Sequence, residues 1–127
     1  MGQRCSMVAL LVAVLTVLGL AGCSESSVEG SCKPSGTTLR IATEERHSIN
    51  TDCLAAPADR LFTIEYRNDD NSPHGNHNIH IQDGGTLFKG DVAGHGSSIT
   101  YKVPALEAGD YRFRCDEHPY MSGDFNV

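Results

Sequence analysis

The chain has 127 residues, of which 39% are hydrophobic and 20% charged, and its formal net charge is −6 at pH 7. This length allows one small domain and excludes a large multidomain enzyme. The acidic charge argues against nucleic-acid binding, because phosphate contacts require clustered Lys and Arg. The chain has five cysteines, an odd number, so they cannot all pair with one another.

The N-terminal segment has the pattern of an export signal. Arg4 precedes an apolar run from Met7 to Leu20, which is followed by small residues and Cys23. At about 15 residues, the run is shorter than the roughly 20 that a transmembrane helix needs. We therefore expect residues 1–22 to be a signal peptide, with a membrane-spanning helix as the less favoured interpretation.

The end of this segment, Leu20-Ala21-Gly22-Cys23, resembles the bacterial lipobox, in which the cysteine becomes the lipidated first residue. The resemblance implies a lipid on Cys23 and an exported protein anchored to the bacterial cell membrane, facing the periplasm or the cell exterior. Polar residues follow Cys23, so we expect 23–31 to be a flexible tether and 32–127 to be the folded domain.

Cys32 and Cys53 lie on either side of the first predicted strand. In an exported protein the expected state of such a pair is a disulfide. Closing a loop of about 20 residues would stabilise the domain by roughly 3 kcal/mol. The alternative, metal binding by this pair, lacks a second close pair of ligands.

Several stretches alternate apolar and polar residues with the period of two that a half-buried strand requires. Breaks rich in Asn, Asp, Gly and Pro separate them. No helical period is sustained, although Leu54–Asp59 is expected to form one helical turn. The pattern predicts an all-β fold, an antiparallel β-sandwich. The expected strands are Thr38–Ala42, Leu61–Arg67, His77–Ile81, Ser97–Val103, Gly109–Cys115 and Gly123–Val127.

A thiol, an imidazole and a thioether occur near the C-terminus at the spacing C-x2-H-x2-M, as Cys115, His118 and Met121. A thiolate, two imidazoles and a weak axial thioether form the ligand set of a mononuclear blue-copper site, whereas zinc has little use for methionine. Cys115 is predicted to end a strand with its side chain inward, and the short loop after it can bring the other two donors back. One imidazole is still missing.

The missing imidazole is expected from residues 71–81, which contain His74, His77 and His80. His77 shares its predicted strand face with Ile79 and Ile81, so it points into the core, while His80 faces the other way. We therefore predict His77 as the upstream ligand and keep His74 as the alternative. His74 and His80 could also form a second, weaker metal site completed by solvent.

These motifs resemble the cupredoxins, the family of plastocyanin, azurin, pseudoazurin and amicyanin, and the ligand loop is most similar to that of amicyanin. Gly109–Cys115 matches the family's strand into the ligand cysteine, and His77-Asn78 matches the upstream histidine and the asparagine after it. One departure is that Pro73 precedes His74 directly, whereas the family often has proline immediately before the ligand histidine. This leaves the register of the upstream ligand open.

The resemblance covers about residues 38–127 and implies a Greek-key sandwich that holds one type 1 copper ion. The copper ligands that it implies are His77, Cys115, His118 and Met121. It also implies that Asn78 helps to tie the two ligand-bearing loops together.

By analogy with the family, the protein is expected to transfer single electrons, as a monomer, to redox partners that it contacts briefly. Electrons are expected to pass through the edge of His118, within an apolar patch that includes Pro119 and Tyr120. Asp116 and Glu117 are expected to favour a basic partner face.

Two other functions are considered, and a copper carrier or storage protein is the main alternative, since it would use the extra His74 and His80. An enzyme is disfavoured, because the chain is short and lacks the paired H-x-H segments of additional copper centres. A binuclear centre would need a second cysteine close to Cys115. His47 and His95 are expected to be surface or internally satisfied histidines.

Overall fold

The computed structural model describes residues 32–127. The predicted signal peptide (1–22), the predicted lipid attachment at Cys23 and the predicted tether (23–31) lie outside the described residues. Within residues 32–127, no helix is long and apolar enough to cross a membrane.

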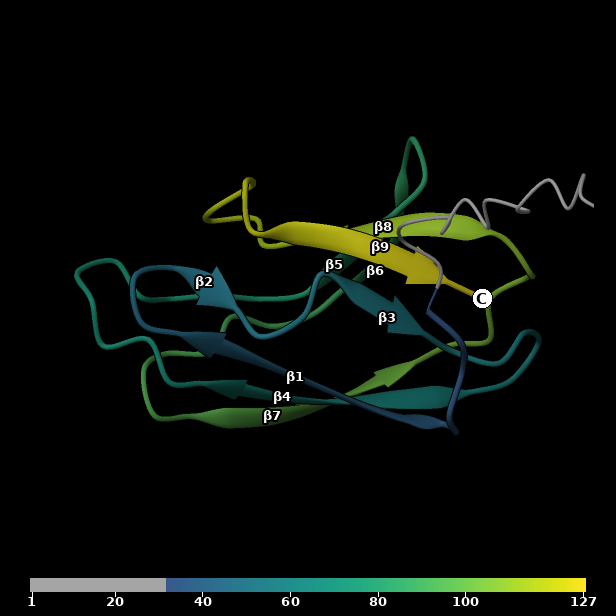
Figure 1. The fold of residues 1–127 in the computed structure, drawn as a ribbon, viewed down its shortest axis with the longest axis horizontal. Helices are drawn as coiled ribbons and strands as arrows, with labels where there is room; N and C mark the ends of the chain where they lie inside the picture. The colour runs from purple at the N-terminus through teal and green to yellow at the C-terminus, as the bar shows by residue number, and fades with distance from the viewer. Residues whose placement is uncertain (1–31) are drawn as a thin grey trace, which may run out of the picture.

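Two β-sheets pack face to face, which confirms the predicted all-β sandwich (Figure 1). In the described part of the chain, one sheet has the strand order β2-β1-β4-β7 and the other β3-β9-β8-β5-β6. The strands are β1 (Thr38–Glu44), β2 (Ser48–Ile49), β3 (Cys53–Ala55), β4 (Phe62–Asn68), β5 (His80–Gln82), β6 (Thr86–Lys89), β7 (Ser98–Val103), β8 (Asp110–Arg114) and β9 (Ser122–Asn126).

The pairing within the sheets differs from a purely antiparallel sandwich. Strands β1 and β4 are parallel, as are β3 and β9, whereas the other paired strands are antiparallel. After β2 the chain crosses to the second sheet as β3 and then returns, so it enters β4 in the same direction as β1. Such a crossover is what places parallel strands side by side. Alternation in the sequence indicates which face of a strand is buried but not the direction of its neighbour.

The predicted alternation does place the core. Strand β4 buries Phe62, Ile64 and Tyr66, while Glu65 and Arg67, on either side of Tyr66, are exposed. The core fills the space between the sheets, and its apolar residues come from both. They are Leu39, Ile41, Leu54, Ala56, Phe62, Ile64, Tyr66, Ile79, Ile81, Ala93, Tyr101, Val103, Leu106, Phe113 and Phe125.

Two local predictions are wrong. The helical turn expected at Leu54–Asp59 is absent, because Cys53–Ala55 forms β3 beside β9 and the buried Leu54 packs into the core. The strand expected over His77–Ile81 begins only at His80, and His77 makes a single isolated bridge to Ala93. In both places long-range contacts override a short local pattern.

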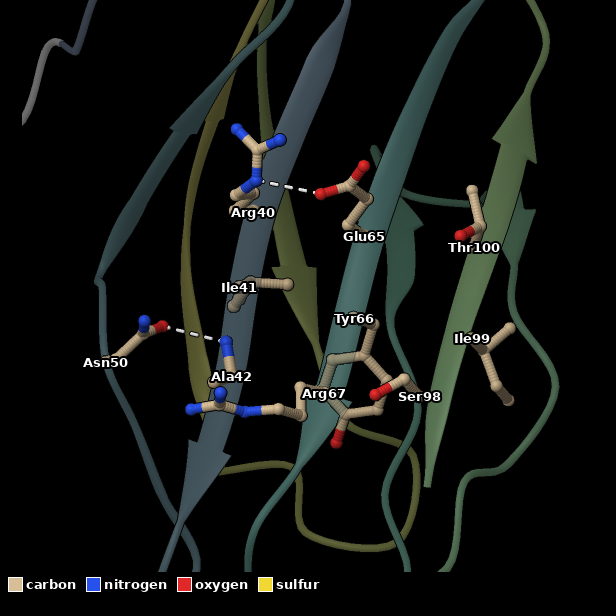
Figure 2. A pocket seen from close by; sticks show the side chains of 10 residues that line it. All are labelled: Arg40, Ile41, Ala42, Asn50, Glu65, Tyr66, Arg67, Ser98, Ile99 and Thr100. Atoms are coloured by element: carbon tan, nitrogen blue, oxygen red, sulfur yellow. Dashed lines mark hydrogen bonds and ion pairs between the residues drawn. The ribbon is translucent and has the colours of Figure 1, made fainter. Parts of the chain in front are cut away.

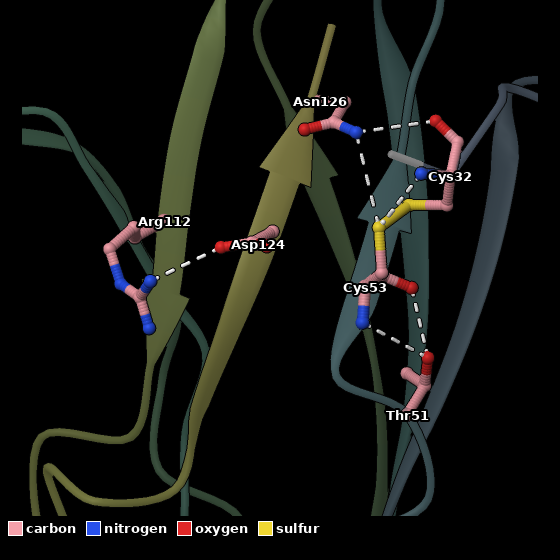
Figure 3. The surroundings of a disulfide bond; sticks show 6 residues. All are labelled: Cys32, Thr51, Cys53, Arg112, Asp124 and Asn126. Atoms are coloured by element: carbon pink, nitrogen blue, oxygen red, sulfur yellow. Dashed lines mark hydrogen bonds and ion pairs between the residues drawn. A yellow bond between two sulfur atoms is a disulfide. The ribbon is translucent and has the colours of Figure 1, made fainter. Parts of the chain in front are cut away.

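Cys32 and Cys53 form a disulfide with a Cα–Cα distance of 6.0 Å (Figure 3). The side chain of Asn126, on β9, donates a hydrogen bond of 3.3 Å to the carbonyl of Cys32. The disulfide therefore joins the start of the described chain to the β3–β9 edge of the second sheet.

The outer face of the first sheet has an open pocket across β1, β4 and β7 (Figure 2). An ion pair of 2.8 Å between Arg40 and Glu65 crosses neighbouring strands there, and the Asn50 side chain accepts a hydrogen bond of 2.9 Å from the backbone of Ala42. None of the predicted metal ligands lines this pocket.

Candidate metal centre

Three connections meet at the end of the sandwich drawn on the left in Figure 1: the β1–β2 turn, the β4–β5 loop and the β8–β9 loop. The first contains His47, the second contains Asp70 and His77, and the third contains His118. Side-chain distances link all four residues. We call this end of the molecule the metal end.

His77 is central to this cluster and is only 1% exposed. Its Nδ1 lies 3.1 Å from His118 Nδ1 and 3.6 Å from Cys115 Sγ. The backbone of His77 is held by two hydrogen bonds to Ala93, of 3.1 and 2.8 Å. The imidazole predicted as the upstream ligand therefore faces the thiol from a fixed position, although it lies in a loop rather than in a strand.

The loop after β8 is tight, and its own backbone closes it. The Cys115 amide donates to the Met121 carbonyl at 2.9 Å, and the Met121 amide donates to the His118 carbonyl at 2.9 Å. Met121 is buried and lines the same small cavity as His77 and Cys115. The structure thus brings the four predicted ligands together, three by direct contacts and Met121 by the shared cavity.

The other two histidines of the upstream segment are placed differently. His74 is exposed in a turn, with a φ of 65°. His80 is buried, and its two ring nitrogens contact Asp116 at 2.7 Å and Thr86 at 3.0 Å. It is His77 and not His74 that faces Cys115. Because both nitrogens of His80 are engaged, the geometry does not support a second metal site of His74 and His80.

Asn78 joins the two ligand-bearing loops, as expected. Its side chain accepts a hydrogen bond of 2.9 Å from the Asp116 amide and donates one of 2.9 Å to the Asp116 carboxylate. It also donates to the carbonyl of Gly90 at 3.1 Å. The residue after His77 is thereby bonded to the residue after Cys115.

The charge of Asp116 is compensated inside the protein. Its side chain is only 19% exposed, contacts His80 Nδ1 at 2.7 Å and forms ion pairs with Lys89 at 3.1 Å and with Arg114 at 3.6 Å. Burial by itself would raise the pKa of Asp116, but hydrogen bonds from His80, Asn78 and Lys89 hold it well below its usual range. The expectation that both Asp116 and Glu117 face a partner therefore needs correction, because only Glu117 is exposed.

His47 belongs to the cluster, and sequence reasoning did not connect it with the site. Its ring stacks on that of His118, with centroids 4.2 Å apart and an angle of 17° between the planes. Among the described residues, His47, His77 and His118 form the group whose ligand atoms lie within 4.8 Å of one another. No spacing motif marks His47, which is 30 positions before His77.

Burial lowers the pKa of His118, and the neighbouring His47 and His77 lower it further. A neutral imidazole is the form that binds a metal. His118 is therefore held in its metal-binding form.

The separations of His77 Nδ1 from the nitrogen of His118 and from the sulfur of Cys115 suit one bound ion. With metal–nitrogen and metal–sulfur distances of roughly 2.0 and 2.3 Å and near-tetrahedral angles, neighbouring donors lie about 3.3 to 3.6 Å apart. The observed separations of 3.1 and 3.6 Å are close to these values. Two imidazoles, one thiol and a buried thioether fit copper better than zinc.

The model of the family described as "Cupredoxin-like domain" matches residues 9–127. This chain belongs to the cupredoxin-like family. The match confirms the resemblance found in the ligand motifs and begins within the predicted signal peptide. A search of curated protein sequences gave no match.

Solved structures share the cupredoxin fold at low sequence identity. Auracyanin from Roseiflexus castenholzii, solved after reduction with dithionite, is 21% identical, with a TM-score of 0.64 over 74% of this cupredoxin and 98% of auracyanin. Auracyanin A from Chloroflexus aurantiacus, described as a "blue" copper protein, is 16% identical, with a TM-score of 0.63 over 76% of this chain and 99% of its own. A copper-containing nitrite reductase from Thermus scotoductus is 24% identical, with a TM-score of 0.53 over 71% of this chain but only 22% of the enzyme.

Proposed function

We propose that this cupredoxin is an electron carrier with one type 1 copper site formed by His77, Cys115, His118 and Met121. The observation that carries the proposal is the convergence of His77 Nδ1 on both Cys115 Sγ and His118 Nδ1, at 3.6 and 3.1 Å. A copper ion bound there would accept and release one electron by alternating between Cu(II) and Cu(I). Auracyanin A, which has the same fold, is described as a blue copper protein.

The surrounding residues suit electron transfer because they resist rearrangement. Cys115 and Met121 are fixed by the backbone hydrogen bonds of their loop, and Asn78 fixes that loop to the one that contains His77. Donors held in this way keep their positions when the charge of a bound ion changes, so little reorganisation accompanies electron transfer. Burial of His77, Cys115 and Met121 also keeps water from these three donors.

A transient redox partner is expected to dock at the surface beside His118. Pro119 and Tyr120 are exposed there, and Tyr120 is 68% exposed with its ring 6.0 Å from that of His118. Such a surface suits the small, short-lived contact of a redox pair. We propose a carrier and not an enzyme, and we propose that it works as a monomer.

A copper carrier or storage protein was the alternative that the extra His74 and His80 suggested. His80 is bonded to Asp116 and Thr86, and His74 is exposed away from Cys115. With no observation left to favour it, we do not propose that alternative.

We also propose that the protein is an exported lipoprotein, anchored through Cys23 to the bacterial cell membrane and facing the periplasm or the cell exterior. The support is the sequence of residues 1–23 together with the disulfide between Cys32 and Cys53, which suits an oxidising compartment. The test is the mass of the mature N-terminus. Cys23→Ala should abolish the acyl-chain mass and release the protein from membranes, and an unmodified Cys23 in the native protein would contradict the proposal.

The copper site is tested by adding Cu(II) to the purified protein and recording visible and electron spin resonance spectra. We expect an intense thiolate-to-copper absorption and a narrow copper hyperfine splitting. Cys115→Ser and His77→Ala should abolish the band, whereas His74→Ala, the matched histidine control, should retain it. A colourless protein, or a band that survives loss of the Cys115 thiol, would refute the assignment.

A further inference from the structure

Asp70 is a buried carboxylate at the centre of the metal end. Its side chain is fully buried, and none of the described Lys or Arg side chains pairs with it. One oxygen accepts hydrogen bonds from the amide and the hydroxyl of Ser72. The other is contacted by His77 Nε2 at 2.8 Å, by His47 Nδ1 at 2.6 Å and by the His47 amide at 3.1 Å. Two histidines therefore share one carboxylate oxygen.

This arrangement determines which nitrogen of His77 carries the proton. An ionised carboxylate only accepts hydrogen bonds, so His77 must donate from Nε2, which leaves the lone pair on Nδ1. Nδ1 is the atom that faces Cys115 and His118. A metal-binding histidine commonly donates its other N–H to a carboxylate in this way, which fixes both its tautomer and the orientation of its ring.

The ring of His47 stacks on that of His118, the second imidazole among the proposed ligands. Its ring lies nearly parallel to that of His118, and it meets His77 edge-on at 5.5 Å. The lone pairs of an imidazole lie in the plane of its ring. A ring stacked face to face on His118, with its Nδ1 donating to Asp70, is therefore oriented to pack against a ligand rather than to serve as one.

The backbone around His47 is strained, which indicates that the position of this ring is maintained by tertiary contacts. Arg46 and His47 are consecutive residues other than glycine with positive φ angles, of 63° and 57°. Such conformations persist where the surroundings over-determine them, and they concentrate at functional sites. The bond from the His47 amide to Asp70 is the contact that anchors this turn to the site.

We propose that Asp70 and His47 are positioning residues of the metal centre: Asp70 holds His77 with Nδ1 directed at the metal, and His47 braces the ring of His118. This inference rests on the proposed copper function. It assigns a role in the site to a turn between β1 and β2 that contains none of the four proposed ligands.

The first test uses the metal-free protein and needs no variant. Nitrogen-15 NMR of the histidine rings should show the proton of His77 on Nε2, and Asp70→Asn should give a mixture of the two tautomers. Finding the His77 proton on Nδ1 in the unsubstituted protein would overturn the role of Asp70. Because no metal is added, this result is independent of whether the protein binds copper.

The second test measures Cu(II) affinity by competition with a chelator, together with the position of the visible band. Asp70→Asn should weaken binding by roughly 10- to 100-fold, the loss typical when a partner of a metal ligand is removed. His47→Ala should also weaken binding and displace the band. The control is His74→Ala, since His74 is an exposed histidine at the same end of the molecule with a similar φ of 65°, and its substitution should change neither.

If both variants bound Cu(II) as tightly as His74→Ala and kept the original band, the positioning role would be refuted although copper binding stood. If the unsubstituted protein developed no blue band, the copper function would fail, while the tautomer of His77 would still decide whether Asp70 orients it.

Discussion

The two ends of the sandwich are stabilised by different chemistry. At the metal end, the buried Asp70 and the half-buried Asp116 join loops by accepting hydrogen bonds from histidines, and the thiol of Cys115 stays free. At the β3–β9 edge of the second sheet, a region that we call the disulfide end, Cys32 and Cys53 are covalently joined. Under the proposed copper function, the metal-end groups both hold the fold and orient the donors, whereas the disulfide-end groups only hold the fold. Substitutions at the disulfide end should therefore lower the free energy of unfolding without changing the visible copper band, whereas substitutions at the metal end should change the band.

The largest effect on stability is expected from the core of the disulfide end. Phe125 is fully buried and stacks on Phe62, with ring centroids 5.7 Å apart. Phe125→Ala should lower the free energy of unfolding by about 3 to 5 kcal/mol, measured by denaturant titration. The folded fraction should keep the blue band. Loss of the band before the protein unfolds would show that the core at the disulfide end also affects the copper site.

Removing the disulfide should have a slightly smaller effect. The bond closes a loop with a sequence separation of 21 residues. The double substitution Cys32→Ser and Cys53→Ser should cost roughly 3 kcal/mol of unfolding free energy, chiefly because the unfolded chain gains freedom. Visible spectra at low denaturant should match those of the unsubstituted protein, and a changed spectrum would indicate coupling between the ends.

At the metal end, Asp116→Asn should change both properties. The substitution removes charge-assisted hydrogen bonds from His80 and Lys89, at a cost of about 2 kcal/mol at pH 7, and should displace the band because Asp116 adjoins Cys115. Its pKa is lower in the folded protein than the ordinary value of 3.8, so its stabilising contribution is present above pH 3.8 and is lost as the pH falls below it.

This pH dependence is checked by unfolding the metal-free protein and its Asp116→Asn variant at pH 7 and at pH 3. The difference in stability between them should be large at pH 7 and smaller at pH 3. An equal difference at both pH values would mean that the carboxylate charge is not what stabilises the loop.

The smallest effect is expected for an exposed ion pair near the disulfide. Arg112 and Asp124 lie 3.1 Å apart on neighbouring strands, and their side chains are 59% and 44% exposed (Figure 3). Arg112→Ala should change the unfolding free energy by less than about 1 kcal/mol and leave the band unchanged. A larger loss of unfolding free energy would show that this exposed ion pair stabilises the disulfide end more than surface ion pairs usually do.

The candidate ligands were predictable because the features that identify them are local. Cys115, His118 and Met121 lie within seven consecutive residues of the chain, and the alternation around His77 indicated an inward side chain even though no strand forms there. His47 was not predictable in this way. It reaches the site because the β1–β2 turn is hydrogen-bonded to Asp70 and its ring stacks on that of His118.

The sequence by itself determined the chemical set of donors, their order along the chain and the buried face of the main strands, since these depend on residue type and on short spacing. The tertiary structure decided that β1 lies parallel to β4, that the Asp116 carboxylate pairs with Lys89, and that Asp70 joins His47 to His77. Each of these depends on contacts between residues that are distant in sequence. The alternation of apolar and polar residues in a strand, for example, is the same whether its neighbour is parallel or antiparallel. The role proposed for Cys115 depends on both: a thiol is a residue type that suits a metal donor, and the fold keeps this thiol free and buried while Cys32 and Cys53 pair.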